Sequence, residues 1–240
     1  MNHLIFNDIC FCYPGNSGVH NLQATIESGQ LVGVIGANGS GKSTMLRLAA
    51  GRIQPESGTI ILDGKSINQW SGKERAQRIS YLPQAIEAGL PFTVSELVRL
   101  GRGADQQQPL FTEEELFDIL GLLPYRETPI NQLSGGERRR AYIAMVLAQG
   151  AHTILLDEPL AGLDLRYQYE LLDLLATLCH THNLTILISL HDLILTQGFD
   201  RILVLKDGRI TVDAPPKEAL TETTIRDTFD LAERFRLLAF

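Results

Sequence analysis

Long hydrophobic runs are missing from this sequence. No apolar stretch approaches the roughly 18 residues that a helix needs to cross a bilayer, so we expect any membrane role to come through a partner. Residues 1–8 also lack the basic-then-apolar order of a secretory signal peptide, and we expect none. Basic residues are scarce as well, because 21 Lys and Arg stand against 28 Asp and Glu, a net charge of −7. That balance argues against a nucleic-acid binder with a large basic surface.

Cysteine is rare, and its spacing gives no disulfide framework. The three cysteines, Cys10, Cys12 and Cys179, form an odd set. Cys10 and Cys12 have a spacing that a metal site can use, but alternation along a strand explains it better. We expect reduced thiols in a cytosolic protein. Tandem repeats, low-complexity segments and long heptad runs are also missing, which argues against repeat architectures and coiled-coil arms.

The most informative segment that is present is a glycine-rich loop. It matches G-x-x-x-x-G-K-[ST], follows the strand-like run 31–35 and precedes residues 45–50, which favour a helix. Glycines let backbone N–H groups approach phosphate oxygens, and the start of the helix adds partial positive charge. We therefore predict a nucleoside triphosphate site, in which Lys42 reaches the β- and γ-phosphates and the Ser43 hydroxyl binds Mg²⁺. The predicted ATP-binding residues of the loop are Gly36, Ala37, Asn38, Gly39, Ser40, Gly41, Lys42, Ser43 and Thr44.

Two adjacent carboxylates follow a second strand-like run, residues 153–156. Ligands of parallel sheets bind at the carboxyl ends of the strands. Asp157 is therefore placed to hold Mg²⁺, and Glu158 to polarise a water for attack on the γ-phosphate. Taken alone, the sequence Asp-Glu-Pro is equally consistent with a solvated turn. The phosphate loop upstream favours the catalytic interpretation.

A third segment begins a helical pattern between the loop and the carboxylates. It consists of Leu133, Ser134, Gly135, Gly136 and Glu137. Ser134 is a good N-cap, and a capped helix start with two glycines forms a second anion site. The alternative is an ordinary capped helix whose arginines, residues 138–140, form its solvated face.

Along the chain the phosphate loop comes first, residues 133–137 second and the two carboxylates third. This order resembles the ATP-binding domain of ABC transporters, with residues 133–137 in the place of the family's signature. The resemblance covers nearly the whole chain and assigns four further residues. Tyr13 is similar to the aromatic that stacks on adenine, although it is also consistent with an ordinary strand tyrosine. Gln84 resembles the glutamine that senses Mg²⁺ and the membrane partner. His191, after another strand-like run, resembles the switch histidine that contacts the γ-phosphate, and Asp164 resembles part of the loop that crosses the dimer interface.

The segment before Asp164 departs from the family pattern. The family's commonest form has Ser or Thr before Ala-Leu-Asp, whereas Leu160 and Gly162 occupy that neighbourhood here. Asp164 itself is retained, so the departure concerns coupling and not ATP binding.

The resemblance implies an α/β fold: a P-loop NTPase core of mostly parallel sheet, with an N-terminal antiparallel β subdomain and an inserted α-helical subdomain. We expect one ABC ATPase domain over residues 1–240, with the core in 1–85 and 136–240 and the helical insert in 86–135. A composition with 44% hydrophobic and 20% charged residues can supply such a core. The predicted strands are 3–13, 19–27, 58–62, 185–189, 201–205 and 209–212, and the predicted helices are 93–100, 112–120 and a tail from Ala219. The sequence does not place the apolar residues 235–240.

Among ABC ATPases, the chain is most similar to those of bacterial importers for iron–siderophore, haem and cobalamin. The residues that carry this narrower resemblance are 100–102, 147–149, 163–168 and 190–193. Two alternatives stay open: an ABC exporter subunit, and a non-transport ABC ATPase that acts on nucleic acid or ribosomes. The second class usually carries coiled-coil arms, zinc modules or two cassettes, and this sequence has none of them.

The family mechanism implies partners and cofactors. Two copies form a head-to-tail homodimer on ATP binding, and each ATP lies between the phosphate loop of one copy and residues 133–137 of the other. Two transmembrane permease subunits and a substrate-binding protein are the expected partners, with no nucleic acid. The chain is then expected at the cytoplasmic face of the inner membrane, bound peripherally through the permease. ATP and Mg²⁺ are the expected cofactors, the implied catalytic residues are Glu158, His191 and Gln84, and the implied metal ligands are Ser43, Gln84 and Asp157.

Overall fold

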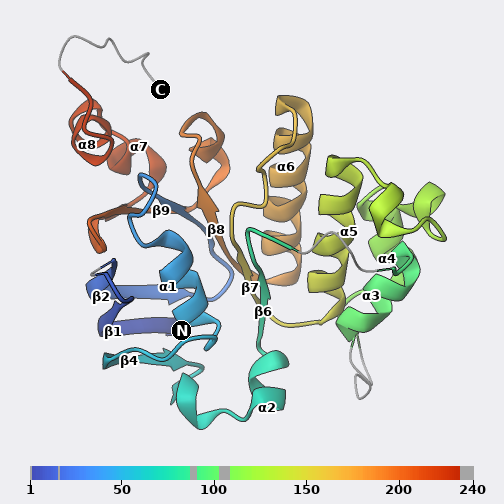
Figure 1. Ribbon diagram of the computed structural model, residues 1–240, viewed down its shortest axis with the longest axis horizontal. Coiled ribbons are helices and arrows are strands. Elements are labelled where there is room, and N and C mark those ends of the chain that lie inside the picture. The colour runs from blue at the N-terminus through green and yellow to red at the C-terminus, as the bar shows by residue number, and fades with distance from the viewer. Residues whose placement is uncertain (1, 16, 87–90, 103–108, 233–240) are drawn as a thin grey trace.

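Two β-sheets and the helices around them form the computed structural model, which describes residues 2–15, 17–86, 91–102 and 109–232 (Figure 1). The larger sheet contains β3 (Leu31–Ile35), β6 (Ile79–Leu82), β7 (Thr153–Leu156), β8 (Thr185–Leu190), β9 (Arg201–Lys206) and β10 (Arg209–Ala214). The smaller sheet contains β1 (Asn2–Cys12), β2 (Gly18–Glu27), β4 (Ser57–Leu62) and β5 (Lys65–Ser66).

The order of the strands confirms the predicted α/β class. The larger sheet runs β10-β9-β3-β8-β7-β6, and all its neighbouring strands are parallel except β10, which pairs antiparallel with β9. The smaller sheet runs β2-β1-β4-β5 and is antiparallel throughout. The core is therefore a mostly parallel sheet. The smaller, antiparallel sheet comes from the N-terminal region of the chain.

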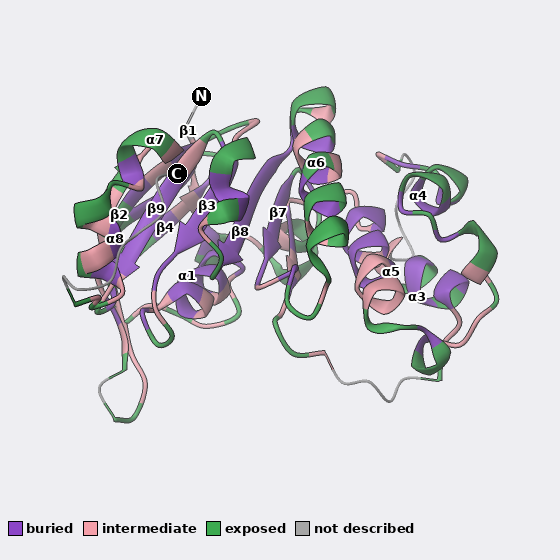
Figure 2. Cartoon of the chain, turned by 90° about the horizontal axis from the view of Figure 1, so that it is seen from above, coloured by how far each residue is buried: buried purple, intermediate pink, exposed green. Residues whose placement is uncertain are grey.

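The central strands of the larger sheet, β3, β7 and β8, are buried on both faces, and apolar residues fill nearly every position in them. Alternate residues of β3 belong to two different cores, Val32 to one and Leu31 to the other. The first core lies between the two sheets and includes helix α1 (Lys42–Ala49). The second core lies on the opposite face, under α5 (Gly135–Ala148) and α6 (Leu165–His182) (Figure 2).

Helices α3 (Val94–Arg102) and α4 (Glu113–Ile119) pack on α5 at the end of the molecule away from the smaller sheet (Figures 1 and 2). They lie within the predicted helical insert, whose boundaries stay a prediction. In the described ranges, no helix combines the length and the apolar character needed to cross a membrane. The remaining helices are α2 (Gly72–Ala76), α7 (Pro216–Ala219), α8 (Glu222–Thr228) and the short 3₁₀ turns η1 (Ile67–Gln69), η2 (Leu123–Tyr125), η3 (Ile130–Gln132) and η4 (Ile194–Gly198).

Local sequence explains where several helices begin. Ser71, Thr112 and Ser134 are the N-caps of α2, α4 and α5. Each side chain accepts a hydrogen bond from the backbone of a glutamate three residues on, whose carboxylate accepts one from the backbone of the cap. This reciprocal arrangement satisfies two donors that a helix start would otherwise leave unpaired. The prediction that Ser134 caps a helix is confirmed.

Two boundaries near the nucleotide loop differ from the expectation. The strand β1 ends at Cys12, so Tyr13 follows it and donates its backbone N–H to the Ser17 carbonyl at 2.7 Å across a turn. The helix after the phosphate loop begins at Lys42 and not at residue 45, because Gly41 already occupies the N-cap.

The C-terminal region also differs from the expected helical tail. The helix α7 ends at Ala219, where the tail was predicted to begin. Thr221 then caps α8, because its hydroxyl accepts a hydrogen bond from the backbone N–H of Thr224. The apolar residues 235–240 lie outside the described residues.

Helix α6, which has 18 residues and is the longest helix described, is not among the predicted helices. Its buried side chains are Leu171, Leu172, Leu175, Leu178 and Cys179. Their separations of three and four residues are the ordinary signal of an amphipathic helix, and that signal could have identified it.

All three cysteines are free. The Cys179 side chain is fully buried, and its thiol donates a hydrogen bond to the Leu184 carbonyl at 2.9 Å. Burial raises the pKa of this thiol to about 12. Cys179 therefore stays protonated and packs as a small hydrophobic group.

Candidate nucleotide site

The glycine-rich loop joins β3 to α1 and needs glycine at two positions for steric reasons. A Cβ atom on Gly36 would lie 2.2 Å from the Leu205 carbonyl oxygen, which no side chain tolerates. Gly41 has φ of +105°, a value that side-chain-bearing residues rarely adopt. It directly precedes α1 and provides no side-chain cap, so the first N–H groups of the helix have no side-chain acceptor from that residue.

Lys42 points back across this loop. Its ammonium donates to the Gly36 carbonyl at 2.8 Å and to the Ala37 carbonyl at 3.1 Å, and the residue is only 5% exposed. Burial lowers the pKa of Lys42, while the nearby Glu158 and Asp157 carboxylates act in the opposite direction. The Lys42 ammonium can therefore leave the two loop carbonyls and donate to phosphate oxygens instead, because a charged acceptor forms the stronger hydrogen bond.

Asp157 lies at the end of β7 and is fully buried. Its Oδ1 atom accepts from the Ser43 hydroxyl at 3.0 Å and from the Ser189 hydroxyl at 2.7 Å. Its Oδ2 atom accepts from the Tyr81 hydroxyl at 3.4 Å. The predicted pair of Ser43 and Asp157 therefore meets, whereas Ser189 and Tyr81 were not predicted. Both missed residues lie on strands that flank β7, so sheet order would have indicated them.

Glu158 joins the two other predicted catalytic residues. One carboxylate oxygen accepts from the Gln84 amide at 2.7 Å, and the other contacts Nε2 of His191. Only 12% of the Glu158 side chain is exposed. Its backbone is in the left-handed region, with φ of +48°, and its N–H donates to the Ser189 hydroxyl at 2.8 Å. Residues more than a hundred positions apart thus converge at one edge of the sheet, as expected where parallel strands end.

Four of these residues, Lys42, Ser43, Gln84 and Glu158, line a cleft of about 360 Å³, whereas Asp157 and His191 are not part of its wall. Tyr13 stands at its side, where its hydroxyl accepts from the Arg47 guanidinium at 3.3 Å and its ring forms a T-shaped pair with the Phe11 ring, the centroids 4.8 Å apart. The aromatic face is held in place, which favours base stacking. The residues that line the cleft are Tyr13, Ser17, Gly18, Asn38, Gly39, Gly41, Lys42, Ser43, Thr44, Gln84 and Glu158.

The donor set fits a magnesium ion. Ser43 and Asp157 supply oxygen atoms 3.0 Å apart, and the Gln84 side chain faces the same cleft. Mg²⁺ prefers oxygen ligands and takes only a few of them from protein, with water and phosphate completing the shell. A hydroxyl, a carboxylate and an amide oxygen meet that requirement.

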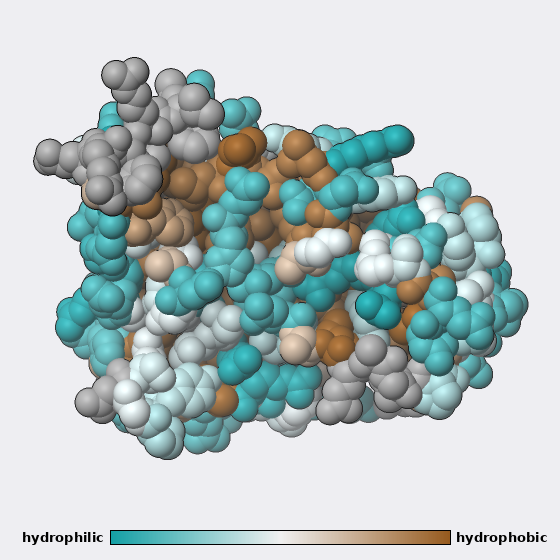
Figure 3. Space-filling model, turned by 45° about the horizontal axis from the view of Figure 1, so that its top comes forward, coloured by the Kyte–Doolittle hydropathy of each residue, from teal (hydrophilic) through white to brown (hydrophobic). Residues whose placement is uncertain are grey.

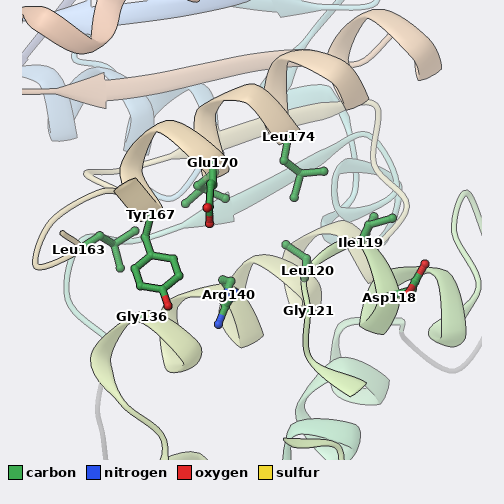
Figure 4. A pocket seen from close by; sticks show the side chains of 11 residues that line it. Asp118, Ile119, Leu120, Gly121, Gly136, Arg140, Leu163, Tyr167, Glu170 and Leu174 are labelled. Atoms are coloured by element: carbon green, nitrogen blue, oxygen red, sulfur yellow. The ribbon is translucent and has the colours of Figure 1, made fainter. Parts of the chain in front are cut away.

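The signature segment does not line this cleft. Among the described residues, none of 133–137 belongs to its wall. Ser134 is exposed at the start of α5, and Gly136 lines a second hollow of about 270 Å³ between α4, α5 and α6 (Figure 4). There the Arg140 guanidinium faces the Tyr167 ring, 5.4 Å from its centroid. One copy of the chain therefore holds its phosphate loop and its signature segment in different places.

Asp164 has a local structural role. It is the N-cap of α6, and its carboxylate accepts from the Tyr167 backbone N–H at 3.0 Å. Just before it, Leu160 is buried, whereas Gly162 is exposed with φ of +78°. In this loop Leu160 packs into the core, and Gly162 allows the backbone to turn.

Arg139 is a further residue that sequence reasoning did not identify. Its guanidinium, carried by α5, donates to the backbone carbonyls of Asp157, Glu158 and Pro159. No motif signals a side chain that binds backbone atoms so far away in the sequence.

Comparison with known proteins adds to this geometry. Residues 19–161 match the protein family described as "ABC transporter". The chain is 40% identical over 233 residues to the hemin import ATP-binding protein HmuV of Rhodopseudomonas palustris (strain ATCC BAA-98 / CGA009). This match covers 92% of this chain and 86% of that protein. It is 37% identical to the petrobactin import ATP-binding protein FpuC of Bacillus anthracis, over 94% of this chain and 86% of that protein.

A solved structure shares the architecture. The dimeric, post-hydrolysis state of the ATP-binding cassette MJ0796, bound to ADP and Pi, superposes with a TM-score of 0.76 at 26% identity. The match covers 89% of this chain and 98% of that one.

Proposed function

The chain belongs to the ABC transporter family and is an ATPase, and from this premise we propose that it is the ATP-binding subunit of a membrane importer. The observation that carries the proposal is the cleft lined by Lys42, Ser43 and Glu158 at the carboxyl ends of β3 and β7. The proposed cargo is an iron chelate, haem or a cobalamin-like compound, because relatives are named for hemin and petrobactin import.

Each polar group has a part in the proposed reaction. The loop N–H groups and Lys42 bind the β- and γ-phosphates of ATP. Glu158 accepts the proton of the attacking water as general base. Gln84 and His191 hold its two carboxylate oxygens, which orients the base. His191 is also the group that contacts the γ-phosphate in this proposal, since it lies beside Glu158.

Two further groups complete the nucleotide site. Tyr13 stacks on the adenine base. Ser43, Asp157 and Gln84 would hold Mg²⁺, which neutralises phosphate charge when bound.

The working site needs two copies in this proposal. Each ATP lies between the loop of one chain and Leu133–Glu137 of the other. The position of Ser134 outside its own cleft supports this arrangement, as does the dimeric relative. Two apolar side chains near predicted site residues are exposed. Leu165 is next to Asp164, the predicted interface residue, and Ile194 lies three positions after His191, the predicted γ-phosphate contact. Figure 3 shows hydrophobic side chains gathered in the upper part of the view, with hydrophilic side chains around them.

The two chains are proposed to bind two permease subunits at the cytoplasmic face of the inner membrane. A substrate-binding protein delivers the cargo on the other side. The region around Gln84 and the helices α3 and α4 passes the movement to the permease. Substrate choice then resides in the permease and the substrate-binding protein, because the cleft lined by Lys42, Ser43 and Glu158 is assigned to ATP in this proposal.

Reconstitution with the permease tests this function. The chain is co-expressed with a candidate permease, and the complex that co-purifies in detergent is placed in vesicles with ATP on the chain's side and a substrate-binding protein on the other. We expect ATP-dependent transport of haem, a ferric siderophore or cobalamin toward the ATP side. The same vesicles with Glu158→Gln serve as the control and should transport none.

Two other outcomes contradict the proposal in different ways. Transport away from the ATP side identifies an exporter. Sedimentation with ribosomes or RNA, without a membrane protein in the purified complex, identifies a non-transport ABC ATPase.

A further inference from the structure

The side chain of Arg139 joins the signature helix to the loop that carries the catalytic carboxylate. From α5, its Nε atom donates to the Pro159 carbonyl at 2.9 Å. Its Nη2 atom donates to the Asp157 carbonyl at 3.0 Å and to the Glu158 carbonyl at 2.6 Å. These three acceptors are consecutive backbone carbonyls, so the guanidinium binds the path of the chain and not a particular side chain.

Arginine suits this task because its donors lie in one rigid plane. The carbonyls of residues 157–159 converge on that plane where Glu158 adopts its left-handed backbone conformation, with φ of +48°. A side-chain-bearing residue adopts that conformation only when its surroundings hold it there. Arg139 holds the Glu158 carbonyl, and the Ser189 hydroxyl accepts from the Glu158 N–H. The backbone of Glu158 is thus fixed from both sides.

The same helix begins at the signature. Ser134 caps α5, and Arg139 lies five positions further along, which is roughly 7.5 Å at the rise of an α-helix. Displacement of the helix start therefore moves the guanidinium with it, because a helix this short is rigid. The exposed end of α5 and the Glu158 backbone are mechanically connected through one side chain.

We propose that Arg139 is a positioning residue that couples the two ATP sites of the homodimer. The inference rests on the proposed function, since it needs the two-copy arrangement. When Ser134 contacts the ATP of the partner, α5 is fixed, and Arg139 thereby fixes Glu158 against the ATP of its own chain. Each chain thus senses one nucleotide and orients the base for the other. Hydrolysis is then cooperative in ATP, because contact of Ser134 with the partner's ATP restricts movement of α5 and thereby keeps the Arg139 contacts with residues 157–159 in place during the reaction.

Replacement of the guanidinium tests the coupling. Arg139→Met keeps the length of the stem and removes every donor. In the permease complex in vesicles, we expect kcat to fall about 10- to 100-fold, because Glu158 loses its orientation. The Hill coefficient for ATP should fall from near its limit of about 2 toward about 1. The affinity of the isolated chain for ATP should change less than about twofold, since Arg139 does not line the cleft.

Two variants separate coupling from folding. Arg139→Lys keeps the charge but not the planar fork, so both values should be intermediate. Arg138→Met removes the neighbouring arginine of the same helix, whose charge acts on Tyr142, and should match the wild type. Thermal unfolding of each variant shows whether the fold is retained. A merely structural role lowers the melting temperature or kcat without moving the Hill coefficient.

The coupling is overturned if Arg139→Met keeps the wild-type Hill coefficient, whatever happens to kcat. Wild-type hydrolysis with a Hill coefficient of about 1 overturns it too, yet leaves the proposed function intact. Failure of the wild-type complex to transport cargo, with cooperative hydrolysis that Arg139→Met abolishes, contradicts the proposed importer and supports the coupling.

Discussion

Helix α1 follows a glycine-rich loop and α5 begins with two glycines, and the two helix starts differ in how their first N–H groups are satisfied. The N-cap of α1 is Gly41, which offers no side-chain acceptor, and its first turn has no acidic residue. The N-cap of α5 is Ser134, which forms a reciprocal capping box with Glu137. Buried charges surround the first start, whereas the second is exposed. One helix start keeps its donors for an anion, and the other is stable without a ligand.

This difference suggests a division of labour. In the proposed function, the cleft at α1 binds a triphosphate within one chain, and the start of α5 contributes only after a second chain brings ATP to it. Variants at the two starts should therefore fail in different ways, and four measurements test that contrast.

The largest effect is expected at α1. Lys42→Ala removes the cation that neutralises the β- and γ-phosphates, so ATP turnover should fall at least ~10³-fold. Phosphate release by the folded variant measures it. Lys65→Ala is the matched control, because Lys65 lies over the Trp70 ring outside the cleft. Turnover near the wild-type rate in Lys42→Ala would overturn the assignment of the phosphate loop.

Glu158→Gln separates binding from cleavage at the same cleft. The amide keeps the shape of the carboxylate but cannot accept a proton, so hydrolysis should slow about 10²–10⁴-fold. ATP binding should persist, and size-exclusion chromatography with ATP and Mg²⁺ should show a dimer that the wild type does not hold. Glu56→Gln, at an exposed carboxylate, is the control.

The two readouts of Glu158→Gln have separate meanings. Fast hydrolysis by this variant removes Glu158 from the role of base. Slow hydrolysis without a dimer keeps the base and counts against the two-copy site.

At the start of α5, Ser134→Arg places a bulky cation where the partner's γ-phosphate is proposed to lie. Turnover should fall roughly 10²-fold, because the nucleotide of the partner is displaced. Binding of ATP to the single chain should persist. Mixing this variant with Lys42→Ala should restore no more than one working site in each mixed dimer. Normal turnover by Ser134→Arg alone contradicts the shared site.

Ser71→Arg provides a matched control for that experiment. Ser71 caps α2 with the same reciprocal box and lies outside the cleft. Loss of either cap should cost about 1 kcal/mol of unfolding free energy. Only the change at Ser134 should stop hydrolysis, so the pair separates the cost of a lost cap from the loss of a binding surface.

The smallest effect concerns pH. Burial lowers the pKa of Lys42 below 10.5, so without ATP its ammonium loses its proton at a lower pH than an ordinary lysine does. ATP binds the protonated form, and its affinity should therefore begin to fall as pH rises through that lowered pKa. The unfolded chain keeps this proton up to a higher pH than the folded chain. Without ATP, the unfolding free energy should therefore rise with pH in the same window.

Titration of the ATP affinity between pH 7 and 10 measures this effect, with Lys42→Met as the control that should lack this component. A wild-type affinity that falls only at pH 10.5 or above, when the titration is extended to that range, contradicts a lowered pKa for Lys42.

Local sequence predicted the parts of the site that depend on local chemistry. The phosphate loop, the Ser134 cap and the carboxylates after β7 each show in a short window, because glycine, capping residues and strand ends have strong local preferences. The convergence of Glu158 and His191 followed from the rule that ligands bind at the carboxyl ends of parallel strands, whereas Gln84 was assigned only by the resemblance to the family. Their individual roles in catalysis stay predictions.

Tertiary contacts account for what the sequence did not reveal. Arg139 binds backbone carbonyls, which any sequence supplies, so no residue pattern marks its partners. Ser189 and Tyr81 reach Asp157 only because β8 and β6 flank β7 in the sheet. The helix α6 was different, since the spacing of its buried leucines indicated it and was overlooked.

The separation of the two helix starts within one chain has a consequence for reaction order. If each working site takes one half from each of two chains, the hydrolysis rate of dilute free chains rises with the square of their concentration. It becomes proportional to concentration only when nearly all chains are paired. A permease that holds two copies side by side replaces that bulk concentration by a fixed effective one, commonly in the millimolar range. Chains that are not bound to a permease would then hydrolyse little ATP, so hydrolysis would be confined to assembled transporters.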